Sequence, residues 1–205
     1  MSRMTSLELE TLHGPARVHL DPAKDARGAL VLGHGAGGGV TAPDLEAATR
    51  GALAVRFTVA LVEQPYRVAG RRSPAPARQL DGAWIAVLEA LRAGPLEGLP
   101  LVTGGRSLGA RVACRTVDAT DAVAVLCLAF PLRPPRRSGE APSRLPELEA
   151  VRVPVLVVQG ERDPFGIPPA SPSRTVVRVA GDHGLKADLP AVADAVSGWL
   201  SGLAV

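Results

Sequence analysis

The sequence predicts an α/β fold, in which a mostly parallel, doubly wound sheet carries helices on both faces, within a single domain spanning residues 1–205. Short apolar runs of strand length alternate with longer stretches of helical periodicity, which is the pattern of β-α-β units. Hydrophobic residues make up 46% of the chain and aromatic residues only 3%, so Val, Leu and Ala must fill the core. Parallel strands buried on both faces have this composition.

The elements are expected in an order that brings the ends of several strands together. Residues 1–27 should form an N-terminal hairpin, with antiparallel strands at Leu7 to Leu12 and Ala16 to Leu20, and its connection. Ligands of a doubly wound sheet bind at the carboxyl ends of its strands. The later strands are expected at Gly28 to Leu32, Phe57 to Val62, Leu99 to Thr103, Ala122 to Ala129, Val153 to Gln159 and Thr175 to Val179, and the helices at Pro43 to Val55, Gln79 to Leu91, Ala110 to Val117 and Leu189 to Leu203.

The most informative motif is Gly105-Arg106-Ser107-Leu108-Gly109, which lies between a predicted strand and a predicted helix. This G-x-S-x-G pattern is typical of a nucleophile elbow. Small residues are needed on both sides of the serine, because the chain reverses direction within a few residues. We therefore expect Ser107 to occupy a strained turn with its hydroxyl exposed.

An aspartate and a histidine follow the serine, each just beyond a predicted strand. Asp163 lies in Gly160-Glu161-Arg162-Asp163-Pro164, and His183 lies in Gly181-Asp182-His183-Gly184. The order serine, aspartate, histidine is that of α/β-hydrolases, which predicts Ser107 as nucleophile, His183 as base and Asp163 as the residue that orients the histidine.

The glycine-rich run at residues 33–39 follows the first buried strand, where these enzymes place the second half of the oxyanion hole. The backbone N–H groups of Leu108 and Ala36 would then receive the negative charge of the oxyanion. His34 precedes this loop, and a structural role is the alternative that we favour for it.

Each candidate has a structural alternative. Ser107 could be only a small residue in a tight turn. His13 and His19, which lie in the opening hairpin, are the alternatives to His183 as the catalytic base. Asp182 competes with Asp163, but it adjoins the histidine, so its side chain should diverge from it. Arg106 could meet an anionic substrate, in a field to which Arg67, Arg71, Arg72 and Arg133 add, or it could form a local ion pair.

Composition excludes several other classes. The net charge is +3 with scattered cations, so a nucleic-acid partner has little support. No apolar run approaches the length of a membrane helix, and no leader segment is evident, which predicts a cytoplasmic protein without a membrane partner. Cys114 and Cys127 lie in apolar stretches and are expected as reduced thiols. Acids and histidines show no ligand spacing, so no metal or cofactor is expected.

The chain resembles the small lidless α/β-hydrolases related to dienelactone hydrolase, most of all a bacterial hydrolase-like subgroup that also includes the hydrolase-like domain of a non-specific-lethal chromatin-complex subunit. Dienelactone hydrolase has a cysteine nucleophile where this chain has Ser107, so its particular chemistry is not implied. The resemblance is carried by His34-Gly35-Ala36-Gly37, Glu63-Gln64-Pro65-Tyr66-Arg67, Gly104-Gly105-Arg106-Ser107-Leu108-Gly109, Phe130-Pro131-Leu132 with Pro134-Pro135, Gln159-Gly160-Glu161-Arg162-Asp163-Pro164-Phe165 and Gly181-Asp182-His183.

The resemblance implies a fold without a lid domain, and residues 131–150 are expected as a short loop in place of a lid. This Pro-rich loop is either a surface connection or a wall of the binding pocket. The candidate substrate-binding residues are Gly35, Arg106, Tyr66, Pro131, Leu132 and Phe165.

The expected function is that of an esterase-like serine hydrolase, a monomer or homodimer that acts on a small ester, thioester or related acyl compound. One alternative is a catalytically silent scaffold with the hydrolase fold. Another is an acyltransferase or carbon-carbon bond hydrolase that uses the same triad, since these differ in pocket shape rather than in catalytic residues.

Overall fold

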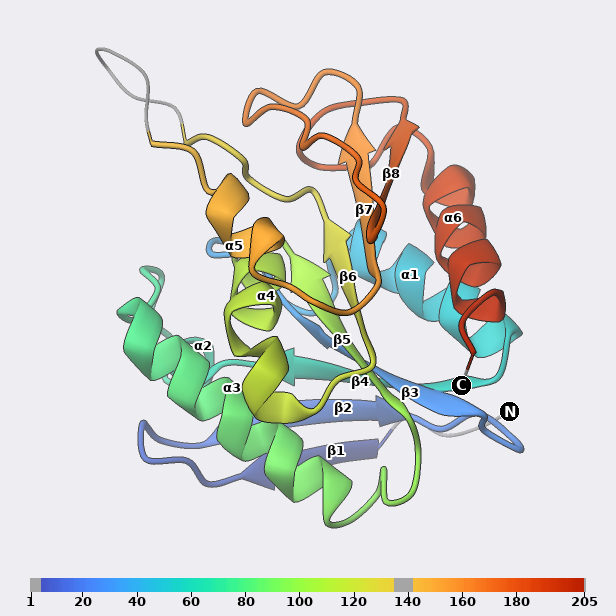
Figure 1. Cartoon of the computed structure of the whole chain (residues 1–205). Coiled ribbons are helices and arrows are strands. Elements are labelled where there is room, and N and C mark those ends of the chain that lie inside the picture. Colours follow the sequence, from blue (N-terminus) through green and yellow to red (C-terminus); the bar gives the residue numbers. More distant parts are fainter. Residues whose placement is uncertain (1–4, 135–141, 205) are drawn as a thin grey trace.

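An eight-stranded sheet forms the centre of the protein, with the strand order β1-β2-β4-β3-β5-β6-β7-β8 (Figure 1). The computed structural model describes residues 5–134 and 142–204. β1 pairs antiparallel with β2, and β2 pairs antiparallel with β4, whereas all later neighbours pair parallel. The strands are β1 (Thr5–Leu9), β2 (Ala16–Asp21), β3 (Gly28–Gly33), β4 (Phe57–Glu63), β5 (Leu101–Arg106), β6 (Ala124–Leu128), β7 (Val155–Gly160) and β8 (Arg174–Val179).

Helices cover both faces of this sheet, as expected for a doubly wound fold. The longer helices α1 (Pro43–Ala54) and α6 (Leu189–Ser201) pack together on one face, and α3 (Ala77–Arg92) and α4 (Leu108–Thr120) pack on the other (Figure 1). The two short helices are α2 (Pro65–Val68) and α5 (Leu145–Glu149). The prediction of an α/β fold with a mostly parallel sheet is therefore confirmed.

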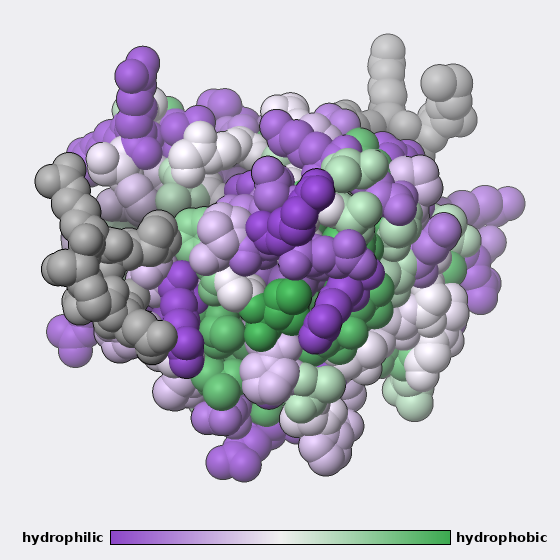
Figure 2. Space-filling model, turned by 90° about the horizontal axis from the view of Figure 1, so that it is seen from above, coloured by the Kyte–Doolittle hydropathy of each residue, from purple (hydrophilic) through white to green (hydrophobic). Residues whose placement is uncertain are grey.

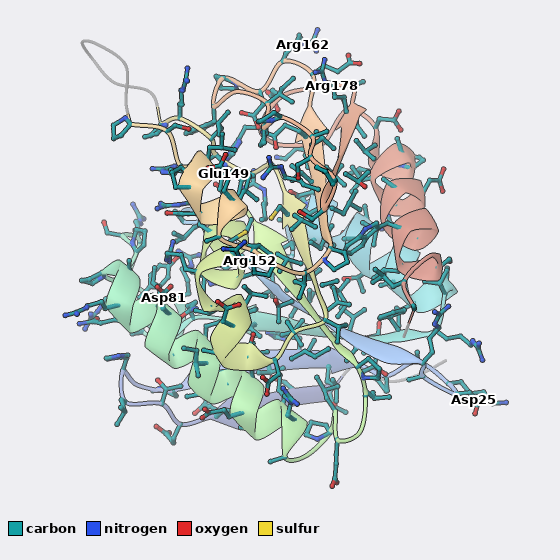
Figure 3. All side chains as sticks on the ribbon, in the orientation of Figure 1. Asp25, Asp81, Glu149, Arg152, Arg162 and Arg178 are labelled. Carbon is teal, nitrogen blue, oxygen red and sulfur yellow. The ribbon has the colours of Figure 1, made fainter. Side chains whose placement is uncertain are left out.

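Local packing explains why these segments fold as they do. The buried residues of α3 recur at helical spacing and face the sheet beside β2, β3 and β4: Leu80, Ala83, Trp84, Val87, Leu88 and Leu91. Asp81 on the same helix, labelled in Figure 3, accepts hydrogen bonds from both Nε and Nη2 of Arg115 on α4. On the other face, Gly51 lets α1 approach the backbone of Ala193 on α6, where a Cβ atom would overlap the Ala193 carbonyl. The sheet is thus held between two close-packed helix pairs.

Several element boundaries differ from the sequence prediction. The first hairpin strand ends at Leu9 rather than Leu12, and the strand expected to end at Ala129 ends at Leu128. Ala129 has a φ of 49°, which is incompatible with a strand and ends β6 there. Of the predicted loop 131–150, residues 135–141 lie outside the described residues, and part of the remainder folds as α5. Within the described residues, no helix is long and apolar enough to cross a membrane.

Candidate active site

The nucleophile elbow lies between β5 and α4, and Ser107 alone makes the turn. β5 ends at Arg106 and α4 begins at Leu108, and Ser107 has a φ of 51° and a ψ of −102°. A positive φ is unfavourable for a residue with a side chain, so surrounding packing must hold it. The Ser107 N–H donates a 2.9 Å hydrogen bond to the Leu128 carbonyl of the adjacent strand β6. The main chain therefore fixes the serine.

Two glycines of the elbow are required by close packing against β3. A Cβ atom on Gly105 would lie 2.5 Å from the Gly33 carbonyl oxygen, and one on Gly109 would overlap the same carbonyl. Both contacts would be closer than a real Cβ atom allows, so glycine is needed at each position. The prediction of small residues on both sides of Ser107 is confirmed.

Ser107, His183 and Asp163 are joined by hydrogen bonds, as the sequence predicts. His183 Nε2 lies 3.0 Å from Ser107 Oγ, and His183 Nδ1 lies 2.8 Å from Asp163 Oδ2. The Asp163 side chain is fully buried, whereas that of His183 is partly exposed. A neutral imidazole that donates from Nδ1 to the carboxylate presents an acceptor at Nε2 to the serine hydroxyl. This arrangement can activate a serine for nucleophilic attack.

The carboxylate of Asp163 is oriented by two further donors, of which one is a side chain that sequence reasoning missed. Gln159 Nε2 lies 2.7 Å from Asp163 Oδ2, and the N–H of Phe165 donates 2.9 Å to Oδ1. The Gln159 amide nitrogen also lies within hydrogen-bond distance of the carbonyls of Phe130 and Gly166. The sequence signal was a lone amide in the otherwise apolar strand β7, four residues before the acid.

Phe165, a candidate substrate-binding residue, packs on His183, and a second candidate, Leu132, lies beside the segment that follows Phe165. The Phe165 ring centroid is 4.3 Å from that of His183, with 39° between the ring planes. Leu132 packs beside Gly166, and the adjacent Arg133 donates its N–H to the Phe165 carbonyl. Segments that follow β6 and β7 therefore meet beside the triad.

The glycine loop after β3 is anchored by His34 and Tyr66. His34 Nδ1 lies 2.8 Å from the Gly35 carbonyl, and its Nε2 accepts a 3.2 Å hydrogen bond from the N–H of Gln64. Burial lowers the pKa of His34 below its ordinary value, so the ring is held neutral. Tyr66 donates its hydroxyl to the Ala36 carbonyl at 3.1 Å. The contacts of His34 agree with the structural role that we favour for it.

Gly35 and Leu108 place the candidate oxyanion segments on either side of Ser107. A Cβ atom on Gly35 would lie 3.8 Å from the Ser107 Cβ atom, so the start of the glycine loop adjoins the serine. Leu108 is the first residue of α4, where backbone N–H groups have no partner within the helix. Helix N-termini favour negative charge, which suits an oxyanion.

The competing residues make contacts other than those of the triad. His19 is on β2, 3.6 Å from Glu63, and the exposed His13 lies beside Gly82 of α3. The Asp182 carboxylate accepts a hydrogen bond from the N–H of Gly184, and the carboxylate bonded to His183 Nδ1 is that of Asp163. For Arg106, the structure shows the local ion pair: its Nε lies 2.8 Å from Asp44 Oδ2.

The two cysteines lie on α4 and β6. Cys114 and Cys127 are both buried, with their sulfur atoms 3.6 Å apart. The hydrogen bond with Cys114, together with burial, raises the pKa of Cys127, which makes it a poor nucleophile. Within residues 5–134 and 142–204, His, Cys, Asp and Glu side chains form no group of three or more that could hold a metal ion.

The strand order, the elbow and the hydrogen-bonded serine, histidine and aspartate define the α/β-hydrolase fold. The sequence profile of the family described as "alpha/beta hydrolase domain" matches residues 26–188, and the chain belongs to this family. No curated protein sequence matches the chain.

Solved structures share this fold over nearly the whole chain. An α/β serine hydrolase without lid from Xanthomonas campestris is 20% identical, with a TM-score of 0.74 over 97% of this chain and 94% of its own. Dienelactone hydrolase from Anabaena variabilis is 15% identical, with a TM-score of 0.76 over 97% of each chain. A thioesterase domain from the curacin biosynthetic pathway is 13% identical, with a TM-score of 0.65 over 95% of this chain and 99% of its own. The expected likeness to lidless hydrolases and dienelactone hydrolase is confirmed.

Proposed function

We propose that the protein is a serine hydrolase that cleaves a small ester, thioester or related acyl bond through a covalent acyl-serine intermediate. One observation carries this proposal: the continuous hydrogen-bonded series from Ser107 Oγ through the His183 imidazole to the Asp163 carboxylate. Family membership and the fold of the solved hydrolases support it.

The reaction would follow acyl-transfer chemistry. Ser107 Oγ attacks the acyl carbonyl carbon while His183 Nε2 takes the hydroxyl proton, and the N–H groups of Leu108 and Ala36 stabilise the resulting oxyanion. As the carbonyl re-forms, the imidazolium gives its proton to the departing alcohol or thiol, which leaves an acyl ester on Ser107. Water, deprotonated by His183, attacks this ester and releases the carboxylic acid and the free serine. Asp163 remains ionised and stabilises the imidazolium in both steps.

The apolar side chains that follow β6 and β7 favour an acyl group that is partly apolar. Figure 2 views the molecule from above, toward the carboxyl ends of the strands β5 to β7, and shows an apolar area bordered by hydrophilic side chains. Leu132, Phe165 and Ile167, which follow β6 and β7, are partly exposed. Such side chains can contribute to binding an acyl chain next to the nucleophile.

The test is intact-mass spectrometry of the purified protein after reaction with a fluorophosphonate probe. We expect a single adduct on the native chain and none on Ser107→Ala or His183→Ala. Ser197→Ala, at a half-buried position on α6, should label like the native chain. The rates of hydrolysis of an acetyl ester and an acetyl thioester, with leaving groups of the same size, would then show which of the two bonds is cleaved faster.

Two outcomes would overturn the proposal. Labelling that persists in Ser107→Ala would place the nucleophile elsewhere. A folded native chain that takes up no probe and hydrolyses no ester or thioester would favour the scaffold alternative.

A further inference from the structure

The guanidinium of Arg106 contacts three segments that flank the nucleophile. Its Nε atom lies 2.8 Å from Asp44 Oδ2 at the start of α1, and its Nη2 donates a 3.1 Å hydrogen bond to the main-chain carbonyl of His183. Its Nη1 lies so close to Gly35 that a Cβ atom there would be 2.7 Å away. One side chain from the elbow therefore joins α1, the glycine loop and the His183 loop, residues 181–184.

The partner carboxylate is buried at a cost. The Asp44 side chain is 1% exposed and that of Arg106 is 19% exposed. Burial raises the pKa of Asp44, and the nearby positive charge of Arg106 opposes that shift. A buried ion pair contributes little net stability compared with apolar side chains of similar volume, so its presence beside Ser107 calls for a reason other than stability.

The His183 loop benefits from such an attachment. Glycines flank the segment at Gly181, which has a φ of 113°, and at Gly184. Asp163 holds the His183 ring on one side, through Nδ1, while Arg106 holds the main chain of the same residue from the side of the elbow. These two attachments together fix the direction in which Nε2 points.

We propose that Arg106 and Asp44 are positioning residues that keep the His183 loop against the nucleophile elbow, so that Nε2 stays within hydrogen-bond distance of Ser107 Oγ. This inference rests on the proposed serine hydrolase function. Arg106 then acts through the histidine, and its charge is used by Asp44 and the His183 carbonyl rather than by an anionic substrate.

The experiment compares Arg106→Met, Arg106→Lys and Asp44→Asn with the native chain. Each is assayed with a neutral aryl acetate and with an aryl hemisuccinate, which carries a carboxylate. We expect Arg106→Met to lower kcat by about 10- to 100-fold for both esters, because small misplacements of a catalytic group have effects of this size. KM should change little, and Arg106→Lys should restore part of the rate.

Arg111→Met is the matched control. Arg111 lies near the start of α4, and its side chain is 22% exposed, close to the 19% of Arg106. It forms hydrogen bonds of 2.9 Å and 2.5 Å with Glu147, which is not part of the triad. We expect this variant to keep native kcat and KM. Arg106→Met with native kcat, or a loss confined to the KM of the hemisuccinate, would overturn the proposal, the second result by assigning Arg106 to substrate binding.

A second readout decides the proposal without any substrate. The chain has four histidines, so the ring signals of His183 can be assigned by NMR through comparison with His183→Ala. Arg106→Met and Asp44→Asn should shift these signals and weaken the proton resonance of the hydrogen bond with Asp163, whereas Arg111→Met should not. Unchanged signals in both variants would overturn the positioning role, whether or not the native chain hydrolyses esters.

The double variant Arg106→Met/Asp44→Asn addresses folding. Removing only Arg106 leaves a buried carboxylate without its partner, which can destabilise the chain. The double variant removes both charges and should lose no more activity than Arg106→Met alone, because the two residues act as one unit. Additive losses in kcat would contradict the proposal.

Discussion

The two halves of the candidate active site are held in place by different means. Ser107 is held by the main chain: its φ of 51° places it in a strained turn, and its N–H bonds to the Leu128 carbonyl. Gly105 and Gly109 let this turn pack directly on Gly33 of β3. Replacing a side chain near the elbow would leave this scaffold in place.

Asp163 and His183 are instead held mostly by side chains, one of them from a distant segment. Gln159 and the main chain of Phe165 orient the carboxylate, the Phe165 ring packs on the imidazole, and Arg106 bonds to the His183 carbonyl. The nucleophile half depends on backbone shape, so substitutions there should lower the stability of the fold. The acid-base half depends on a hydrogen-bond network, so substitutions there should lower the activity.

The largest effect should come from breaking the main-chain half with Gly109→Ala. Its Cβ atom would overlap the Gly33 carbonyl, a rigid backbone group, so we expect the free energy of unfolding to fall by about 3 kcal/mol. Urea denaturation measures this change. Gly198→Ala is the control, since that glycine also lies in a helix but has open space around its Cβ position, and it should gain roughly 0.5–1 kcal/mol. Equal stabilities for the two variants would mean that the elbow relaxes freely.

A smaller effect, on activity, should come from Gln159→Met in the side-chain half. Methionine has a similar length but donates no hydrogen bond to Asp163, and a bond to a charged group contributes about 1.5 kcal/mol, or roughly tenfold in rate. We expect fluorophosphonate labelling to slow by about that factor. Gln64→Met removes another buried amide, which donates to the Leu80 carbonyl, and should cost stability without slowing the reaction. Equal labelling rates for both variants would remove Gln159 from the network.

The same contrast explains how far the sequence could predict the molecule. The alternation of strands and helices predicts the fold, and the glycines at fixed spacing predict the elbow, because backbone constraints leave local marks on the sequence. The role of Asp44 could not be predicted in this way, since its contact with Arg106 is made only by the fold, as is the bond between Arg106 and His183, 77 residues apart. Gln159 left only the signal of a lone amide in an apolar strand, which does not say what the amide contacts. That Ser107, Asp163 and His183 catalyse a reaction stays a prediction.

A third region, the glycine loop, depends on both main-chain and side-chain contacts, because the His34 side chain bonds to the main chain of the loop. His34 bonds to the Gly35 carbonyl and accepts from the N–H of Gln64, and burial lowers its pKa from the ordinary 6.5. In the unfolded chain the ring titrates at its ordinary value, so below pH 6.5 the unfolded state binds the extra proton. The contribution of His34 to stability is therefore complete above pH 6.5 and is lost as the pH falls toward the lowered pKa of the folded state.

The smallest effect we predict is thus pH-dependent and is measured with His34→Gln. At pH 8 this variant should be less stable than the native chain by about 1 kcal/mol, because glutamine replaces the two hydrogen bonds imperfectly. At pH 5 the difference should shrink or reverse, since only the native chain loses stability through this imidazole. Urea denaturation at both pH values measures the gap, with His13→Gln as the control for an exposed histidine. A gap of the same size at both pH values would show that the glycine loop does not depend on a neutral His34, and would leave the loop held by its main chain alone, like the elbow.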